Sequence, residues 1–190
     1  GEDTPEECFS YPFPFKLHQN IRQVEEIPSQ VFLGHRRLSI VDLSPAGHQP
    51  HVSSNQQYIL CYNGEIYNHR ELRSELEQLG HKFNTQCDTE VIPIAYHEWG
   101  IDFLQKLNGM FSFILYDRKT KSAICVRDRM GIKPLYIWHD NKGSLAVASE
   151  IKSFQSLPGW QANLNHNRAM DYLNYMQMDH TDETMFSGVT

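Results

Sequence analysis

The chain has 190 residues, 40% of them hydrophobic, which is enough to bury the core of one globular domain. Its 17 basic and 23 acidic residues give a formal net charge of −6, which argues against a general nucleic-acid-binding protein. No apolar run approaches the roughly 18 residues that span a membrane, and no basic-then-apolar leader is visible, so we expect a cytoplasmic protein with no membrane partner.

Residues 1–33 differ in character from the rest of the chain. Pro12 and Pro14 remove two hydrogen-bond donors from this stretch, which predicts an extended arm rather than a central strand. We expect a first strand to begin in residues 30–33, and residues 37–42 to continue the same sheet.

The apolar run over residues 58–61 predicts a strand, and Asn63-Gly64 follows at the point where we expect it to end in a turn. A glycine N–H beside an asparagine side-chain amide gives two adjacent donors, which is what an oxyanion needs. Glu65 adds a charge that could hold an ammonium group. The alternative is an ordinary Asn-Gly turn without a binding role.

Two amphipathic helices follow. The first is predicted over residues 68–79, with Asn68 as N-cap, Glu71 three residues later and Gly80 at its end. The second is predicted over residues 89–99, with Asp88 as the cap before it. A short helix is expected over residues 102–107.

The hydrophobic pattern then changes to that of strands. Four are predicted, over residues 110–116, 123–127, 135–139 and 145–149, and one more helix begins near Asn167. Strand-rich segments around two central helices indicate a layered α+β fold.

Motifs in a fixed order identify a family resemblance. They are residues 34–44 with Gly47-His48-Gln49-Pro50, then residues 62–68, 87–92, 107–113, 127–136 and 148–152. In this order the chain resembles the class II glutamine amidotransferase domain of asparagine synthetase B-type enzymes. The resemblance implies a four-layer α-β-β-α sandwich of the N-terminal-nucleophile hydrolase type.

The resemblance also implies roles for individual residues. Arg37 would pair with the α-carboxylate of glutamine, Asn63 and Gly64 would form the oxyanion hole, and Glu65 and Asp88 would hold the α-ammonium group. The pocket walls would be Leu38, Ile40 and Val41. Simpler alternatives stay open: Arg37 as a surface cation, Asp88 as a helix cap alone, and Glu65 as a solvated charge.

The nucleophile does not follow the family pattern. Family members use a cysteine at the mature N-terminus, followed by Gly and Ile, whose free α-amine acts as the base. Residue 1 here is Gly1, and the nearest candidate, Cys8, is followed by Phe9 and Ser10. The first hypothesis is therefore a domain inactive as a glutaminase that either keeps a glutamine pocket or serves only as a structural or docking half. The alternative is an active glutaminase, with Cys8 exposed by processing, that supplies ammonia to an ATP-dependent synthetase domain.

The expected organisation is an atypical arm (1–33), an amidotransferase-like domain (34–160), and a linker with the start of a truncated synthetase-type domain (161–190). ATP and magnesium are expected only in a separate synthetase domain, and no cofactor in this chain. His35, His48 and His51 lack metal-ligand spacing, so no metal site is expected. The expected partners are glutamine and a synthetase-type domain or subunit, with a homodimer left open.

Overall fold

The computed structural model describes residues 9–10, 19–20, 31–36, 48–140, 143–178 and 180–190. The chain divides into two compact units, Gly1–Met130 and Gly131–Thr190. Within the first unit, β1 (Phe9–Ser10) and β2 (Gln19–Asn20) form an antiparallel pair.

A four-stranded antiparallel sheet forms the centre of the first unit. Its order is β3 (His51–Val52), β4 (Tyr58–Ile66), β5 (Gly109–Asp117) and β6 (Ser122–Arg127). The long strands β4 and β5 pair along their whole length, with Tyr58 opposite Asp117 and Ile66 opposite Gly109.

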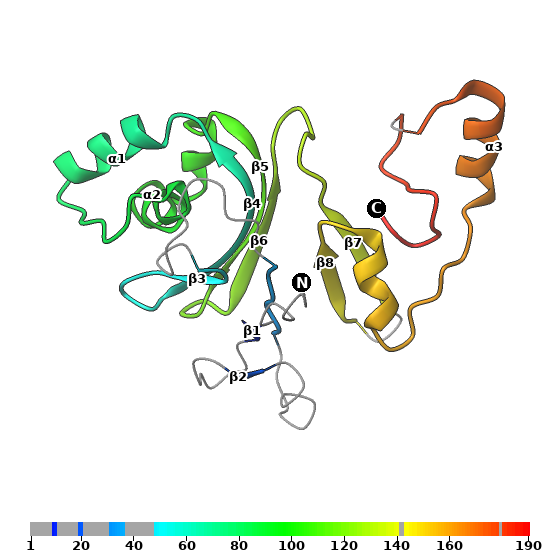
Figure 1. The fold of residues 1–190 in the computed structure, drawn as a ribbon, viewed down its shortest axis with the longest axis horizontal. Coiled ribbons are helices and arrows are strands. Elements are labelled where there is room, and N and C mark those ends of the chain that lie inside the picture. Colours follow the sequence, from blue (N-terminus) through cyan, green and yellow to red (C-terminus); the bar gives the residue numbers. More distant parts are fainter. Residues whose placement is uncertain (1–8, 11–18, 21–30, 37–47, 141–142, 179) are drawn as a thin grey trace, which may run out of the picture. The chain divides into compact units, whose positions relative to one another are not determined.

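Two helices, α1 (His69–Gln78) and α2 (Val91–Trp99), lie on one face of this sheet (Figure 1). Short 3₁₀ helices, Asp88–Glu90 and Gly100–Gln105, flank α2. The side chains that fill the layer between helices and sheet are buried and include Leu60, Tyr62, Leu72, Leu76, Val91, Ile92, Phe103 and Phe113. This layer is the main core, and it holds β4 against the helices.

The opposite face of β4 carries a second, smaller cluster. Ile59 and Cys61 alternate with the core side chains and pack with Leu33 and Tyr116. The thiol of Cys61 lies 3.8 Å from the carbonyl oxygen of Gly34. Residues 31–36 therefore run along this face of the sheet.

The second unit contains the antiparallel pair β7 (Tyr136–His139) and β8 (Leu145–Ala148), the 3₁₀ helix Ile151–Ser156, and α3 (His166–Tyr175). Phe154 is buried, with its ring centroid 6.4 Å from that of Trp138. None of the side chains of α3 is buried.

The structure confirms most of the predicted elements. Both central helices and the last helix lie within two residues of their predicted starts, and the four later strands lie within one residue of theirs. The mixture of helices and antiparallel sheets agrees with the α+β class. The sequence pattern does not predict the strand β3 or the 3₁₀ helix Ile151–Ser156.

Two predictions about strands are wrong. Asn63-Gly64 does not end a strand, because β4 continues to Ile66 and stays paired with β5. The strand expected to begin in residues 30–33 is absent from positions 31–33, which form no regular element. Its expected continuation over residues 37–42 lies outside the described residues.

Of the two predicted helix caps, Asn68 does occupy the N-cap position of α1 but its side chain makes no capping hydrogen bond, and the prediction for Asp88 is wrong. The Asn68 side chain does not cap α1: its Oδ1 accepts from the N–H of Asn108 at 2.9 Å, and its Nδ2 donates to the carbonyl of Lys106 at 2.9 Å. Asp88 does not cap α2, because its carboxylate binds groups of β4 instead. Both side chains tie separate segments together rather than beginning a helix.

Candidate functional site

The site is built on the edge of β4 that faces away from β5. Hydrogen-bonding groups of a strand alternate between its two edges. Tyr67, just after β4, donates its N–H to the carbonyl of Asn108 on the β5 side at 2.8 Å. The even-numbered residues Tyr62, Gly64 and Ile66 therefore direct their N–H groups to the opposite edge.

The side chain of Gln49 pairs with the backbone of Tyr62, the first of these three residues. Its Oε1 accepts from the N–H of Tyr62 at 2.6 Å, and its Nε2 donates to the carbonyl of Tyr62 at 2.8 Å. Gln49 is 8% exposed, so both hydrogen bonds are shielded from water. The side-chain amide thus continues the pairing of β4 where β3 has ended.

The carboxylate of Asp88 accepts from the N–H of Ile66, the last of these three residues. Its Oδ2 accepts from the N–H of Ile66 at 3.1 Å and from the hydroxyl of Tyr62 at 2.6 Å. The carboxylate is 5% exposed, so these donors replace the water that it loses on burial. Burial, followed by the charge of Asp88, raises the pKa of the Tyr62 hydroxyl, which therefore stays protonated and donates.

Gly64 lies between these two anchors. Its N–H has no hydrogen-bond partner among the residues that the structure describes, whereas those of Tyr62 and Ile66 are both occupied. Its φ of +151° is one that side-chain-bearing residues rarely adopt. The edge therefore presents one backbone donor at a position that glycine alone accommodates well.

Asn63 and Glu65 continue the odd-numbered row of β4, on the face that carries Ile59 and Cys61. Asn63 is half-buried and Glu65 is exposed. The structure thus brings Asn63, Gly64, Glu65 and Asp88 to the same end of β4. The roles assigned to them stay predictions.

The remaining predicted site residues, Arg37, Leu38, Ile40, Val41 and Cys8, lie outside the described residues. Sequence reasoning missed Gln49 and Tyr62 as parts of the site. The available signals were the Gln-Pro pair in one of the family motifs and the position of Tyr62 two residues before Gly64 on a strand.

The described cysteines are poorly suited to nucleophilic attack. Burial raises the pKa of the Cys61 thiol to about 12, and burial also raises the pKa values of Cys87 and Cys125. A thiol with a raised pKa is largely protonated near neutral pH and reacts slowly.

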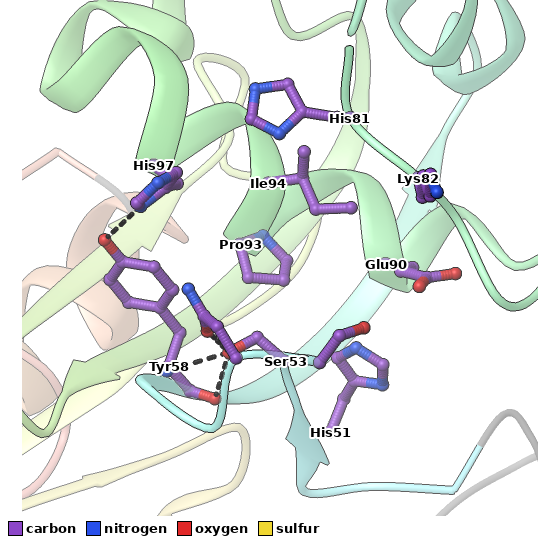
Figure 2. Close-up of a pocket in the computed structure, with 11 residues that line it drawn as sticks. His51, Ser53, Tyr58, His81, Lys82, Glu90, Pro93, Ile94 and His97 are labelled. Atoms are coloured by element: carbon purple, nitrogen blue, oxygen red, sulfur yellow. Dashed lines mark hydrogen bonds between the residues drawn. The ribbon is translucent and has the colours of Figure 1, made fainter. Parts of the chain in front are cut away.

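A separate hollow lies near the beginning of β4. Figure 2 shows residues around this cavity of about 200 Å³, among them His51, Tyr58, His81, Lys82, Glu90 and His97. Tyr58 and Gly64 are six residues apart on one strand, which corresponds to about 20 Å. This cavity is therefore distinct from the edge that carries Gly64.

Within the described ranges, no group of three His, Cys, Asp or Glu side chains is arranged to hold a metal ion. No helix in the described part of the chain is long and apolar enough to cross a membrane.

The chain matches the family model for the glutamine amidotransferase domain over residues 22–190. A putative asparagine synthetase (glutamine-hydrolysing) of Mycobacterium tuberculosis H37Rv is 42% identical over 167 residues, which are 84% of this chain and 25% of the relative. Asparagine synthetase B (glutamine-hydrolysing) of Escherichia coli K12 is 47% identical over 121 residues, 64% of this chain and 22% of that protein. The chain thus spans a quarter or less of these relatives.

A solved structure shares the fold. The glutamine phosphoribosylpyrophosphate amidotransferase of Bacillus subtilis, solved with ADP and GMP, aligns with a TM-score of 0.54 and 28% identity over 64% of this chain and 28% of that one. The fold is α+β, of the N-terminal-nucleophile hydrolase type with its α-β-β-α sandwich, and α1, α2 and the four-stranded sheet supply one helical layer and one sheet. The chain belongs to the glutamine amidotransferase domain family, in the class II group found in asparagine synthetases.

Proposed function

We propose that this domain binds glutamine at the open edge of β4 and that this chain does not hydrolyse it. The side-chain amide oxygen of glutamine would accept from Asn63 and from the N–H of Gly64, and Glu65 and Asp88 would hold the α-ammonium group. Arg37 would pair with the α-carboxylate, beside Leu38, Ile40 and Val41. Gly34, three residues before Arg37, lies next to Cys61 on the face that carries Asn63, which supports this assignment.

The observation that carries the proposal is the Gly64 N–H. It lies between two occupied backbone donors and has no partner among the described residues. An oxyanion-binding donor has to be available to a ligand and fixed in direction, and the neighbouring hydrogen bonds to Gln49 and Asp88 fix the strand on both sides.

The proposed lack of hydrolysis rests on the cysteines. Cys61, Cys87 and Cys125 are internal residues without a free α-amine, and their pKa values are raised. Cys8 is followed by Phe9 and Ser10 instead of the Gly and Ile of the family pattern. None of the three thiols in the described part of the chain then combines a low pKa with a free α-amine of its own residue.

The relatives suggest the wider setting. The curated proteins named glutamine-hydrolysing asparagine synthetases are several times longer than the segments that match this chain. We propose that the domain works in the cytoplasm beside a synthetase-type domain or subunit. ATP and magnesium would bind to that synthetase-type domain rather than to this chain. Formation of a homodimer is a further proposal.

The test measures binding and turnover on the same sample. We expect L-glutamine to raise the melting temperature while D-glutamine does not, with no ammonia or glutamate released. Asn63→Ala should weaken L-glutamine binding, and intact mass should show the unprocessed chain. Absence of any glutamine-dependent stabilisation would rule out the binding proposal.

The second candidate is an active glutaminase, which the names of the curated relatives favour. Ammonia release that appears together with a mass corresponding to a chain starting at Cys8 would replace the first proposal with this one. Cys8→Ala should then abolish release and leave glutamine binding intact.

A further inference from the structure

The carboxylate of Asp88 is held asymmetrically. Both strong hydrogen bonds, from the Tyr62 hydroxyl at 2.6 Å and the Ile66 N–H at 3.1 Å, end on Oδ2. Among the described residues, Oδ1 has one contact, the thiol of Cys87 at 3.5 Å, and a thiol is a weak donor. The two oxygens of one buried carboxylate therefore have different capacities to bind a further donor.

We propose that Tyr62 is a positioning residue for ligand recognition: its hydroxyl fixes the Asp88 carboxylate so that Oδ1 is available to the α-ammonium group. This inference rests on the proposed function, in which Asp88 binds that group.

The physical argument concerns rotation of the carboxylate. The Ile66 N–H alone would hold one oxygen but would leave the group free to turn about its Cβ–Cγ bond. The second donor comes from a side chain that is 4% exposed and packed between the sheet and the helices. Two donors from different directions restrict this rotation, so less conformational freedom is lost when the ligand binds.

The test compares two ligands that differ only in the ammonium group. These are L-glutamine and glutaramic acid, which is glutamine without its α-amine. Calorimetric or NMR titration should show that Tyr62→Phe weakens L-glutamine binding by about tenfold, as expected for a hydrogen bond to a charged group. Binding of glutaramic acid should change by less than about twofold, because that ligand makes no contact of this kind.

Tyr58→Phe is the matched control. Tyr58 lies on the same strand and packs in the same core, is 5% exposed, and contacts Nδ1 of His97 rather than Asp88. It should leave both affinities unchanged. Equal weakening of both ligands by Tyr62→Phe would indicate a general structural role and overturn the inference, as would an unchanged affinity for L-glutamine.

Asp88→Asn tests the same pair from the other side. If Tyr62 acts through Asp88, combining Tyr62→Phe with Asp88→Asn should reduce the preference for L-glutamine over glutaramic acid no further than Asp88→Asn alone does. Additive losses would overturn the inference while leaving the proposed function in place. Failure of the unaltered chain to bind L-glutamine would remove the proposed function, and this inference with it.

Discussion

At the scale of single residues, Gly64 is constrained by the strand beside it. A Cβ at this position would lie 2.2 Å from the carbonyl oxygen of Met110 and 2.6 Å from the Cα of Phe111. Gly109 has the reciprocal contact, with a Cβ 2.2 Å from the carbonyl oxygen of Glu65. Two glycines therefore let β4 and β5 approach closely where the candidate site lies.

Gly64→Ala should lower the free energy of unfolding by roughly 2–4 kcal/mol, because it combines an unfavourable φ with overlap against backbone atoms. Urea unfolding measures the change. Gly80→Ala is the control: φ is +96° there, but no atom lies within 4 Å of the added Cβ, so a loss of roughly 1–2 kcal/mol is expected. Equal losses in the two variants would contradict the overlap argument.

At the scale of elements, Glu90 links the start of α2 to the preceding loop. Its carboxylate accepts from the N–H of Asn84 at 2.9 Å, and from the N–H and hydroxyl of Thr85 at 2.8 and 2.9 Å. The side chain is 3% exposed. These contacts fix the segment that leads to Asp88.

Glu90→Gln should lower the free energy of unfolding by roughly 1.5–3 kcal/mol, because an amide replaces an acceptor-only group and loses hydrogen bonds to a charge. Thermal and urea unfolding measure the change. Glu98→Gln is the control, since Glu98 is exposed and pairs with His81, and a loss of about 1 kcal/mol or less is expected there. A smaller effect at Glu90 than at Glu98 would show that the carboxylate is dispensable.

The elements also show what sequence patterns can and cannot predict. Leu72 and Leu76 on α1, and the alternating residues of β4, follow periods that local sequence reveals. Asp88 resembles a helix cap in the sequence because its strand partner Ile66 is 22 residues away. The contacts of Gln49 with Tyr62 span 13 residues and leave no periodic signal. Local patterns thus predict elements, whereas side chains that join them require the folded chain.

At the scale of the whole molecule, motif order predicts Asn63, Gly64, Glu65 and Asp88 as site residues, and they lie at one end of β4. Their roles depend on a ligand, which the fold alone does not supply. Arg37 and Cys8 lie outside the described residues, so their roles stay predictions.

Thiol reactivity should report on the folding of the first unit as a whole. Cys61 is buried and its pKa is raised to about 12, so at a pH of about 8 its thiolate is scarce and inaccessible. Cys125 is exposed on β6; partial burial of its thiol also raises its pKa, so its advantage over Cys61 is its accessibility. Iodoacetamide should therefore modify Cys125 well before Cys61 in the native protein, as followed by peptide mass spectrometry.

In urea the two thiols should react at similar rates, which serves as the control. Native Cys61 reacting as fast as Cys125 would mean that the core around Leu33 and Tyr116 opens readily, contrary to the packing seen there.

Beyond β3, side chains rather than another strand close the described edge of β4. Gln49 accepts from the N–H of Tyr62, and Asp88 accepts from the N–H of Ile66. Among the described residues, the N–H of Gly64 between them has no partner. Exposed strand edges can template pairing between chains and lead to aggregation, but a single donor is too short for that. At this edge of β4, the side chains of Gln49 and Asp88 therefore also limit intermolecular β-pairing.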